Sequence, residues 1–364
     1  MPIAFDADRW TKVKETYRQF WGGELERPII PVVLKGRDPG RPMPQAPLLS
    51  QETCHDFSWS AEQLIDRIDY ELSCYEFLGD AYPYFNLDCF GPGVVAAMLG
   101  GRLDNSSGRV WFWPGEEKPI QDIHLALQPD NRWLQRIKDI CAAGMERWQG
   151  QVLVGMTDLG GNLDIPATFV TSQQLLLELI DHPDDVIRLT WEAHEAWHQA
   201  YAQINAVLQP VNPGYSDWSY IYSDQPSYML QCDFSYMISP RMFGKFVLPE
   251  LKATTTRLKR SFYHLDGIGQ IGHLDQLLTL PSLNGVQWIH GDGKPDSSHW
   301  PEIFQKIHAA GKKIQIISGG FAAVEAVWEQ IGRPRVPGIH YQAVYGTLDD
   351  KSAMQAHLAR FQIA

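Results

Sequence analysis

The sequence predicts an α/β fold, a TIM (β/α)8 barrel that forms a single domain over residues 1–364 with an N-terminal helical extension. From about residue 239 onward, strand and helix patterns alternate at short intervals. Repeated βα units of this length imply parallel strands joined by crossover helices. Further strand patterns in the first part of the chain bring the number close to eight. This number favours a closed barrel over an open sheet, and such barrels commonly form one domain.

The second half of the chain contains the more regular elements. Ser239-Pro240 supplies an N-cap followed by a proline at the first helical position, so we expect a helix from there to about Lys259. Thr347 and Asp350 form a capping pattern for a final helix. Between these points we expect strands at 261–265, 286–289, 313–317 and 339–344, and helices at 272–279, 301–310 and 321–331.

Polar residues stand at the expected ends of several strands. The first half is less regular, and there we expect strands at 29–34, 84–87, 151–156 and 228–233. In a (β/α)8 barrel the chemistry lies at the C-terminal ends of the strands. The polar residues at these ends are Asn86, Asp88, Asp158, Gln231, Asp233, His264, Asp266, His290 and Asp292.

Two of these strand ends carry a His-x-Asp pair followed by glycine. Side chains alternate along a strand, so His264 and Asp266 point to the same side, as do His290 and Asp292. Imidazole and carboxylate groups together suit a divalent metal or proton transfer. We expect His264, Asp266 and Asp88 to be catalytic, and His264, Asp266 and His290 to hold zinc or another divalent metal. The residues expected to contact substrate are Asn86, Asp158, Gln231, Asp233, His290 and Asp292.

Composition excludes several classes of function. The formal net charge is -12, which disfavours binding to nucleic acid or to anionic membranes. The apolar runs are too short to span a bilayer, and the first residues lack a secretory signal. The five cysteines are scattered and never form CxxC, which is typical of reduced thiols in the cytoplasm. We therefore expect a cytoplasmic protein that acts on a small molecule.

A glycine motif offers a competing interpretation. Gly267 to Gly272 form a literal G-x-G-x-x-G after a strand, and Asp292 lies at the next strand end, as in dinucleotide-binding loops. The strand before the glycines, however, carries His264 and Asp266, where a dinucleotide-binding strand is apolar to its tip. The other interpretation is a tight turn beneath a crowded site.

A second literal motif is His194-Glu195-Ala196-Trp197-His198, which matches H-E-x-x-H on a helix. Both imidazoles could bind zinc, with Glu195 as the base. No third ligand follows in the pattern of a protease, and both histidines flank the apolar stripe of the helix. This favours two boundary histidines on an outer helix.

The chain resembles the uroporphyrinogen decarboxylase-like superfamily. The resemblance rests on the order and spacing of motifs along most of the chain, namely Glu26-Arg27-Pro28, Phe85-Asn86-Leu87-Asp88, Phe90-Gly91-Pro92-Gly93, Thr157-Asp158-Leu159-Gly160-Gly161, Gln231-Cys232-Asp233, Ile238-Ser239-Pro240-Arg241-Met242-Phe243, Phe246-Val247-Leu248-Pro249-Glu250 and Tyr263-His264-Leu265-Asp266-Gly267. It implies a TIM barrel. It also implies one of two activities: porphyrinogen decarboxylation, or methyl transfer by zinc enzymes that act with corrinoid proteins and thiols.

The chain departs from both branches of this family. The arginine-rich motif that grips propionate groups is missing, since the corresponding region reads Lys35-Gly36-Arg37-Asp38. The zinc methyltransferases carry His-x-Cys where this chain has His264-Leu265-Asp266, and no cysteine follows Cys232. Any metal ligands must therefore be oxygen and nitrogen, which leaves a harder Lewis acid than a thiolate site.

The sequence supports four functions. The leading one is a corrinoid-linked methyltransferase that moves a methyl group between a small substrate and a corrinoid or thiol acceptor. A partner protein would supply the corrinoid (cobalamin), and the family resemblance implies a homodimer. The alternatives are a metal-independent decarboxylase or lyase using Arg241 or Lys245 to bind a carboxylate, a non-catalytic binding subunit, and an NAD-dependent oxidoreductase.

Overall fold

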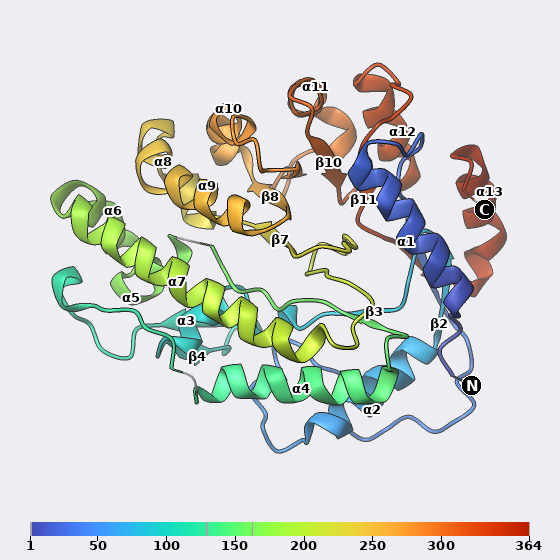
Figure 1. Ribbon diagram of the computed structural model, residues 1–364, viewed down its shortest axis with the longest axis horizontal. Coiled ribbons are helices and arrows are strands. Elements are labelled where there is room, and N and C mark those ends of the chain that lie inside the picture. Colours follow the sequence, from blue (N-terminus) through green and yellow to red (C-terminus); the bar gives the residue numbers. More distant parts are fainter. Residues whose placement is uncertain (1, 129, 162, 364) are drawn as a thin grey trace.

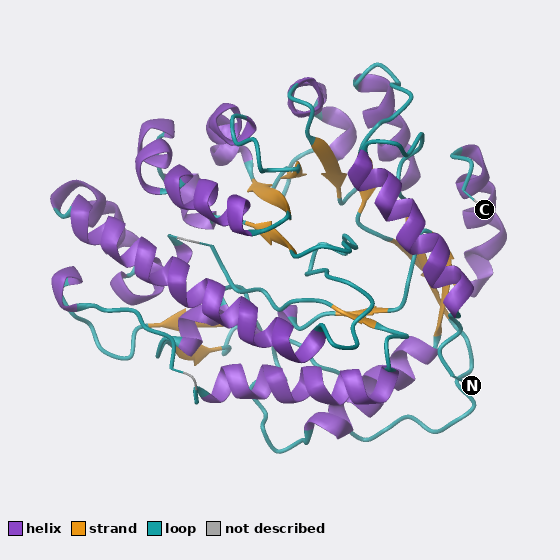
Figure 2. Ribbon diagram, in the orientation of Figure 1, coloured by secondary structure: helices purple, strands orange, loops and turns teal. Residues whose placement is uncertain are grey.

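The computed structural model describes residues 2–128, 130–161 and 163–363 of the chain. The fold is mixed α/β, with helices outside and strands inside (Figures 1 and 2). The strands are β1 (Pro31–Lys35), β2 (Tyr75–Gly79), β3 (Tyr84–Phe85), β4 (Arg102–Asp104), β5 (Trp111–Trp113), β6 (Leu153–Val154), β7 (Ser227–Leu230), β8 (Arg260–Asp266), β9 (Gly285–Ile289), β10 (Lys313–Ile316), β11 (Ile339–Tyr341) and β12 (Val344–Thr347). The α-helices are α1 (Ala7–Gly22), α2 (Ala61–Ser73), α3 (Val94–Met98), α4 (Arg132–Trp148), α5 (Asp164–Val170), α6 (Ser172–Asp181), α7 (Pro183–Leu208), α8 (Pro240–Phe246), α9 (Leu248–Arg257), α10 (Leu274–Leu278), α11 (Pro301–Ala309), α12 (Gly320–Gln330) and α13 (Lys351–Arg360).

The largest sheet is parallel and has five strands in the order β11-β10-β9-β8-β7. Helices α8 to α12 follow one another along its outer side (Figure 1). Its strands are almost continuously buried, as expected where both faces of a parallel sheet are covered. The alternating βα units predicted for the second half of the chain are confirmed.

The first half contributes the other strands. Strand β1 pairs with β12 in parallel and with β2 in antiparallel orientation, and a parallel bridge joins Ile29 to His340 beside β11. Strand β3 pairs with β6, and Met156 N–H, just after β6, donates to the Ser216 carbonyl at 2.8 Å. Across the described residues these ladders form four separate sheets. The closure of all strands into one barrel therefore stays a prediction.

Two predicted elements are each split in the structure. The helix expected from Ser239-Pro240 to Lys259 is two helices, α8 and α9, which meet at Val247. Pro249 explains the break, because proline lacks the N–H that would continue the helical ladder. The strand expected at 339–344 is also two strands, β11 in the large sheet and β12 beside β1. The antiparallel β4–β5 hairpin was not predicted.

Helix α1 covers the N-terminal ends of the strands. Trp10 Nε1 donates to the Gln151 carbonyl just before β6, and Trp21 Nε1 donates to the Tyr222 carbonyl before β7, both at 2.9 Å. Tyr17 is completely buried on the same helix. Because this end of the sheet is covered, the C-terminal strand ends are the place where polar side chains can reach a substrate.

Within the described residues, helices that combine the length and the apolar character needed to cross a bilayer are absent.

Candidate functional site

Three of the predicted strand-end residues come together in one place. Asp233, His264 and Asp266 each offer a metal-ligating atom, and these atoms all lie within 4.8 Å of one another. We call these residues the acid–histidine cluster. Asp233 follows β7, whereas His264 and Asp266 lie two residues apart at the end of β8, with Nε2 of His264 3.9 Å from Oδ2 of Asp266. The adjacency of two parallel strand ends thus builds the cluster.

The surroundings of His264 prepare its ring to act as a ligand. Trp218 packs edge-on against the imidazole, with ring centroids 5.0 Å apart and planes at 89°. Nδ1 is hydrogen-bonded to Oε1 of Gln287. Burial lowers the pKa of His264, although Gln287 and Asp266 oppose that shift. The ring is therefore held neutral, and neutral imidazole is the form that binds metals.

Asp233 is held in place by a carboxylate that the sequence analysis did not single out. Asp164, in the first turn of α5, accepts hydrogen bonds from the backbone N–H groups of Asp233 at 2.9 Å and Phe234 at 2.7 Å. These bonds fix the short turn that starts at Asp233 and so hold its side chain beside His264 and Asp266.

Carboxyl groups with raised pKa values surround the cluster. Burial raises the pKa of Asp158, Asp164 and Asp233 to about 7 in each case. The nearby carboxylates Asp158 and Asp266 add to the shift of Asp233. Burial also raises the pKa of Asp88. Groups that titrate near neutrality at one end of a sheet are typical of a functional site.

One member of the acid–histidine cluster, Asp233, lines a pocket of about 320 Å³, which we call the strand-end pocket. Its polar wall includes Gln231, Asp233 and Asp164. Its apolar wall includes the β4–β5 hairpin, where Trp111 and Trp113 are 56% and 50% exposed. A pocket with an aromatic wall and a few convergent polar groups is the usual form of a small-molecule site.

Asp158 and Gln231 contact each other, and Asn86 lies in the turn after β3. Asp158 accepts a hydrogen bond from the Gly160 N–H at 3.0 Å and lies 3.5 Å from Nε2 of Gln231. Asn86 Oδ1 accepts the N–H of Asp88 at 3.3 Å and so shapes the turn after β3. These contacts place Asp158 and Gln231 beside the pocket.

The predicted ligand His290 is engaged elsewhere. Its Nδ1 lies 2.9 Å from the Gly291 carbonyl, and its Nε2 lies 3.1 Å from Oγ of Ser318. Asp292 is exposed just beyond it. The group that could hold a metal therefore contains Asp233 where the sequence analysis placed His290.

The H-E-x-x-H histidines are buried between helices α7 and α9. His194 Nδ1 lies 2.7 Å from Oε1 of Glu250, and His198 Nε2 lies 3.2 Å from Oγ1 of Thr254. Burial lowers the pKa of His198 to about 3, so its ring stays neutral. The two histidines connect the outer helices α7 and α9, which agrees with the structural interpretation of this motif. They are, however, buried, whereas the sequence placed them at the edge of the buried face.

The glycine motif leads into a short 3₁₀ segment, Ile268–His273, and α10 after it has only five residues. A Cβ atom added at Gly269 would lie 2.8 Å from the ring of Tyr236. The glycines thus let the chain turn closely beneath Tyr236. This geometry favours the tight turn over a dinucleotide-binding loop, which needs a helix N-terminus facing the phosphates.

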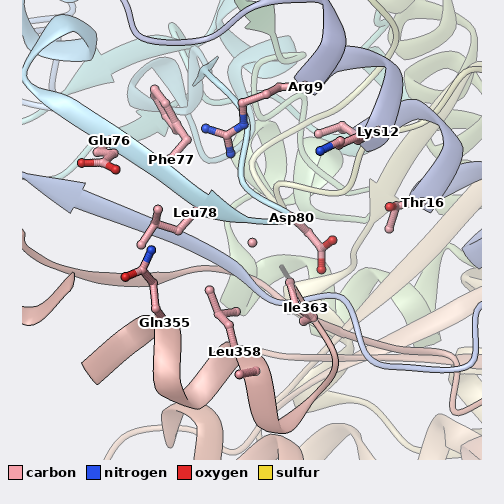
Figure 3. A pocket seen from close by; sticks show the side chains of 13 residues that line it. Arg9, Lys12, Thr16, Glu76, Phe77, Leu78, Asp80, Gln355, Leu358 and Ile363 are labelled. Atoms are coloured by element: carbon pink, nitrogen blue, oxygen red, sulfur yellow. The ribbon is translucent and has the colours of Figure 1, made fainter. Parts of the chain in front are cut away.

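A second cavity, of about 450 Å³, lies between α1, β2 and α13 (Figure 3). Its polar lining includes Arg9, Lys12 and Asp80. Asp80 is already paired with Arg27 at 2.7 Å. The residues that line this cavity include no member of the predicted site, so the strand-end pocket remains the candidate.

Sequence analysis missed three residues that shape the site: Asp164, Trp218 and Gln287. Asp164 lies in a loop-to-helix junction, and Trp218 lies in an irregular segment, so neither follows a strand pattern. Gln287 had an available signal, because it is a polar residue within the buried strand Gly285–Ile289. A buried amide in such a strand needs a hydrogen-bond partner.

Fold and site together define an α/β protein with an acidic, metal-capable centre at the C-terminal ends of parallel strands. Comparison with solved structures finds similarity to a methyltransferase from Methanosarcina mazei, with a TM-score of 0.59 and 13% sequence identity. The alignment covers 96% of this chain and 99% of that protein. At this identity the likeness establishes the fold. No family model and no curated protein matches the chain.

Proposed function

We propose that the protein is a methyltransferase of the corrinoid-linked, uroporphyrinogen decarboxylase-like type, assisted by a divalent metal. The observation that carries this proposal is the acid–histidine cluster at the edge of the strand-end pocket. The structural likeness along the whole chain to a protein named as a methyltransferase supports it. We also propose that the strands close into a (β/α)8 barrel, which the bridge between Ile29 and His340 supports.

The donor atoms of the cluster fit a divalent ion of intermediate hardness. Asp233 and Asp266 supply two carboxylates, and neutral His264 supplies one nitrogen. Such a set suits zinc, manganese or iron, whereas thiolates would select softer ions. When bound, the ion would act as a Lewis acid that makes an acceptor such as a thiol more nucleophilic.

The residues of the chain have separate tasks in this proposal. Asp233, His264 and Asp266 hold the ion, and Asp164 orients Asp233 through the backbone. The aromatic wall excludes water from the methyl group. The exposed side chains of Trp111 and Trp113 leave an apolar rim open at the surface. This exposed apolar rim is an argument for a partner protein that docks there and presents the corrinoid to the pocket.

The decarboxylase alternative has less support from the pocket. A decarboxylase that acts on a small acid needs a cation to bind the substrate carboxylate. The described residues lining the pocket include Asp164 and Asp233 but neither lysine nor arginine, and the proposed partners Arg241 and Lys245 lie outside this lining. Above about pH 7, where Asp164 and Asp233 are ionised, the electrostatic field of this wall repels anions.

A transfer assay tests the proposal. Purified protein is given Zn²⁺, with methylcobalamin as donor and 2-mercaptoethanol as acceptor, and the loss of the methyl–cobalt bond is followed by absorbance. We expect metal-dependent transfer that falls by about 100-fold or more in His264→Ala. His290→Ala is the matched control at the next strand end, and it should retain the metal. Equal rates in His264→Ala and the unaltered protein, or no transfer with any divalent ion, would contradict the proposal.

A further inference from the structure

Four polar side chains form a row across the buried interior of the large sheet. They are direct cross-strand partners on β8, β9, β10 and β11 in turn, and we call them the polar row: His264, Gln287, Gln315 and His340. Gln287, Gln315 and His340 are completely buried. A row of buried polar groups must be hydrogen-bonded throughout, because each unpaired group would be costly.

A backbone carbonyl fixes the direction of the hydrogen bonds along this row. Gln315 Nε2 donates to the carbonyl of Ser219 at 2.7 Å and lies 3.2 Å from Nδ1 of His340. If the amide of Gln315 were turned over, its oxygen would face the Ser219 carbonyl, and neither atom could donate. The two hydrogens of Gln315 Nε2 therefore point to Ser219 and His340, and its Oε1 must point the other way.

The direction is passed on to His264. Gln287 Nε2 donates to Oε1 of Gln315 at 2.7 Å, so the amide oxygen of Gln287 faces His264. An amide oxygen can only accept, so Nδ1 of His264 must carry the hydrogen. In the neutral ring the other nitrogen, Nε2, then holds a lone pair, and this is the nitrogen that faces Asp266 at 3.9 Å.

We propose that Gln287 is a positioning residue that locks His264 in the Nδ1–H tautomer and so presents the Nε2 lone pair to a divalent metal. That Nε2 of His264 binds a metal rests on the proposed function. The tautomer itself is a property of the metal-free chain. The Ser219 carbonyl fixes the orientation of the Gln315 amide, and Gln315 in turn fixes the orientation of the Gln287 amide. Partners that fix the tautomer of a metal-binding histidine commonly change metal affinity by 10- to 100-fold.

The far end of the row supplies a matched control. His340 Nε2 lies 2.8 Å from the hydroxyl of Tyr17 on α1, at the end away from the cluster. Tyr17→Phe removes one buried hydrogen bond of the row, whereas Gln287→Met removes two. Tyr17→Phe leaves the path from Ser219 to His264 intact. A merely structural role of the row predicts similar effects of both variants on the site.

The tautomer is tested by nitrogen NMR on metal-free protein labelled with ¹⁵N-histidine, with the His264 signals identified by their loss in His264→Gln. We expect a protonated Nδ1 and an unprotonated Nε2 in the unaltered protein, and a mixture of tautomers in Gln287→Met. The opposite tautomer, or a mixture, in the unaltered protein overturns the inference even if Gln287→Met fails to fold.

Metal affinity is measured in the same proteins by calorimetric titration with Zn²⁺. We expect Gln287→Met to bind about 10- to 100-fold more weakly than the unaltered protein, and Tyr17→Phe to bind as the unaltered protein does. Unchanged affinity in Gln287→Met, or equal weakening in both variants, overturns the inference. Absence of Zn²⁺ binding by the unaltered protein would defeat the proposed function, and the NMR result would still decide the tautomer.

Discussion

We expect Asp158 to make the protein less stable as the pH rises toward neutrality. Its carboxylate lies at the polar end of the segment after β6, where Oδ1 accepts the Gly160 N–H at 3.0 Å. Burial raises its pKa from 3.8 to about 7. Between about pH 4 and pH 7 the folded state keeps this proton while the unfolded state has lost it. The free energy of unfolding therefore falls as the pH rises through this window, and the contribution of Asp158 is greatest at or below its ordinary pKa.

The size of the effect follows from the pKa difference. A difference of about three corresponds to at most about 4 kcal/mol, since one pKa unit is worth about 1.36 kcal/mol. Asp158→Asn keeps the shape and the acceptor oxygen but cannot ionise. We expect this variant to match the unaltered protein near pH 4 and to exceed it in stability at pH 8, by up to about 4 kcal/mol.

Urea unfolding at pH 4.5, 6 and 8, followed by tryptophan fluorescence, measures this difference. The chain has 13 tryptophans, so the signal is ample. Asp292→Asn, the same substitution at an exposed strand end, is the matched control. A constant difference between Asp158→Asn and the unaltered protein from pH 4.5 to pH 8 would refute the reasoning.

Three further outcomes are expected. Zn²⁺ at 100 times its dissociation constant should stabilise the protein by about 2.7 kcal/mol and raise Tm by about 3 to 4 °C in calorimetry, and Asp266→Asn should abolish this shift. His194→Ala removes a hydrogen-bond partner of Glu250, so urea unfolding should show a loss of about 1–3 kcal/mol, while the zinc content measured by mass spectrometry should not change. Gly285→Ala places a Cβ atom against the ring of Phe262 and should cost about 1–3 kcal/mol by the same unfolding assay.

The second half of the fold could be predicted because its signals are local. Ser239 caps α8 as expected, with its side chain accepting the Met242 N–H at 3.3 Å. The alternation of buried strands with amphipathic helices then gives the parallel sheet. The first half is harder to predict because β3 and β6 have only two residues each. Strands so short leave no periodicity to detect.

In the site, too, the features set by local sequence could be predicted, whereas those set by contacts between distant residues could not. The pairing of His264 with Asp266 follows from strand alternation, and Asp233 lies at the next strand end. His290 follows the same local rule, yet its ring is engaged by Ser318 after β10. Sequence spacing cannot reveal that contact, because it depends on how two neighbouring strand ends pack.

The central claim is that Asp233, His264 and Asp266 hold a divalent metal. The most direct measurement is anomalous diffraction at the zinc absorption edge from crystals grown with Zn²⁺. The account predicts a strong peak between the carboxylates of Asp233 and Asp266 and Nε2 of His264. The absence of a peak there, or a peak only at His194 and His198, would contradict it.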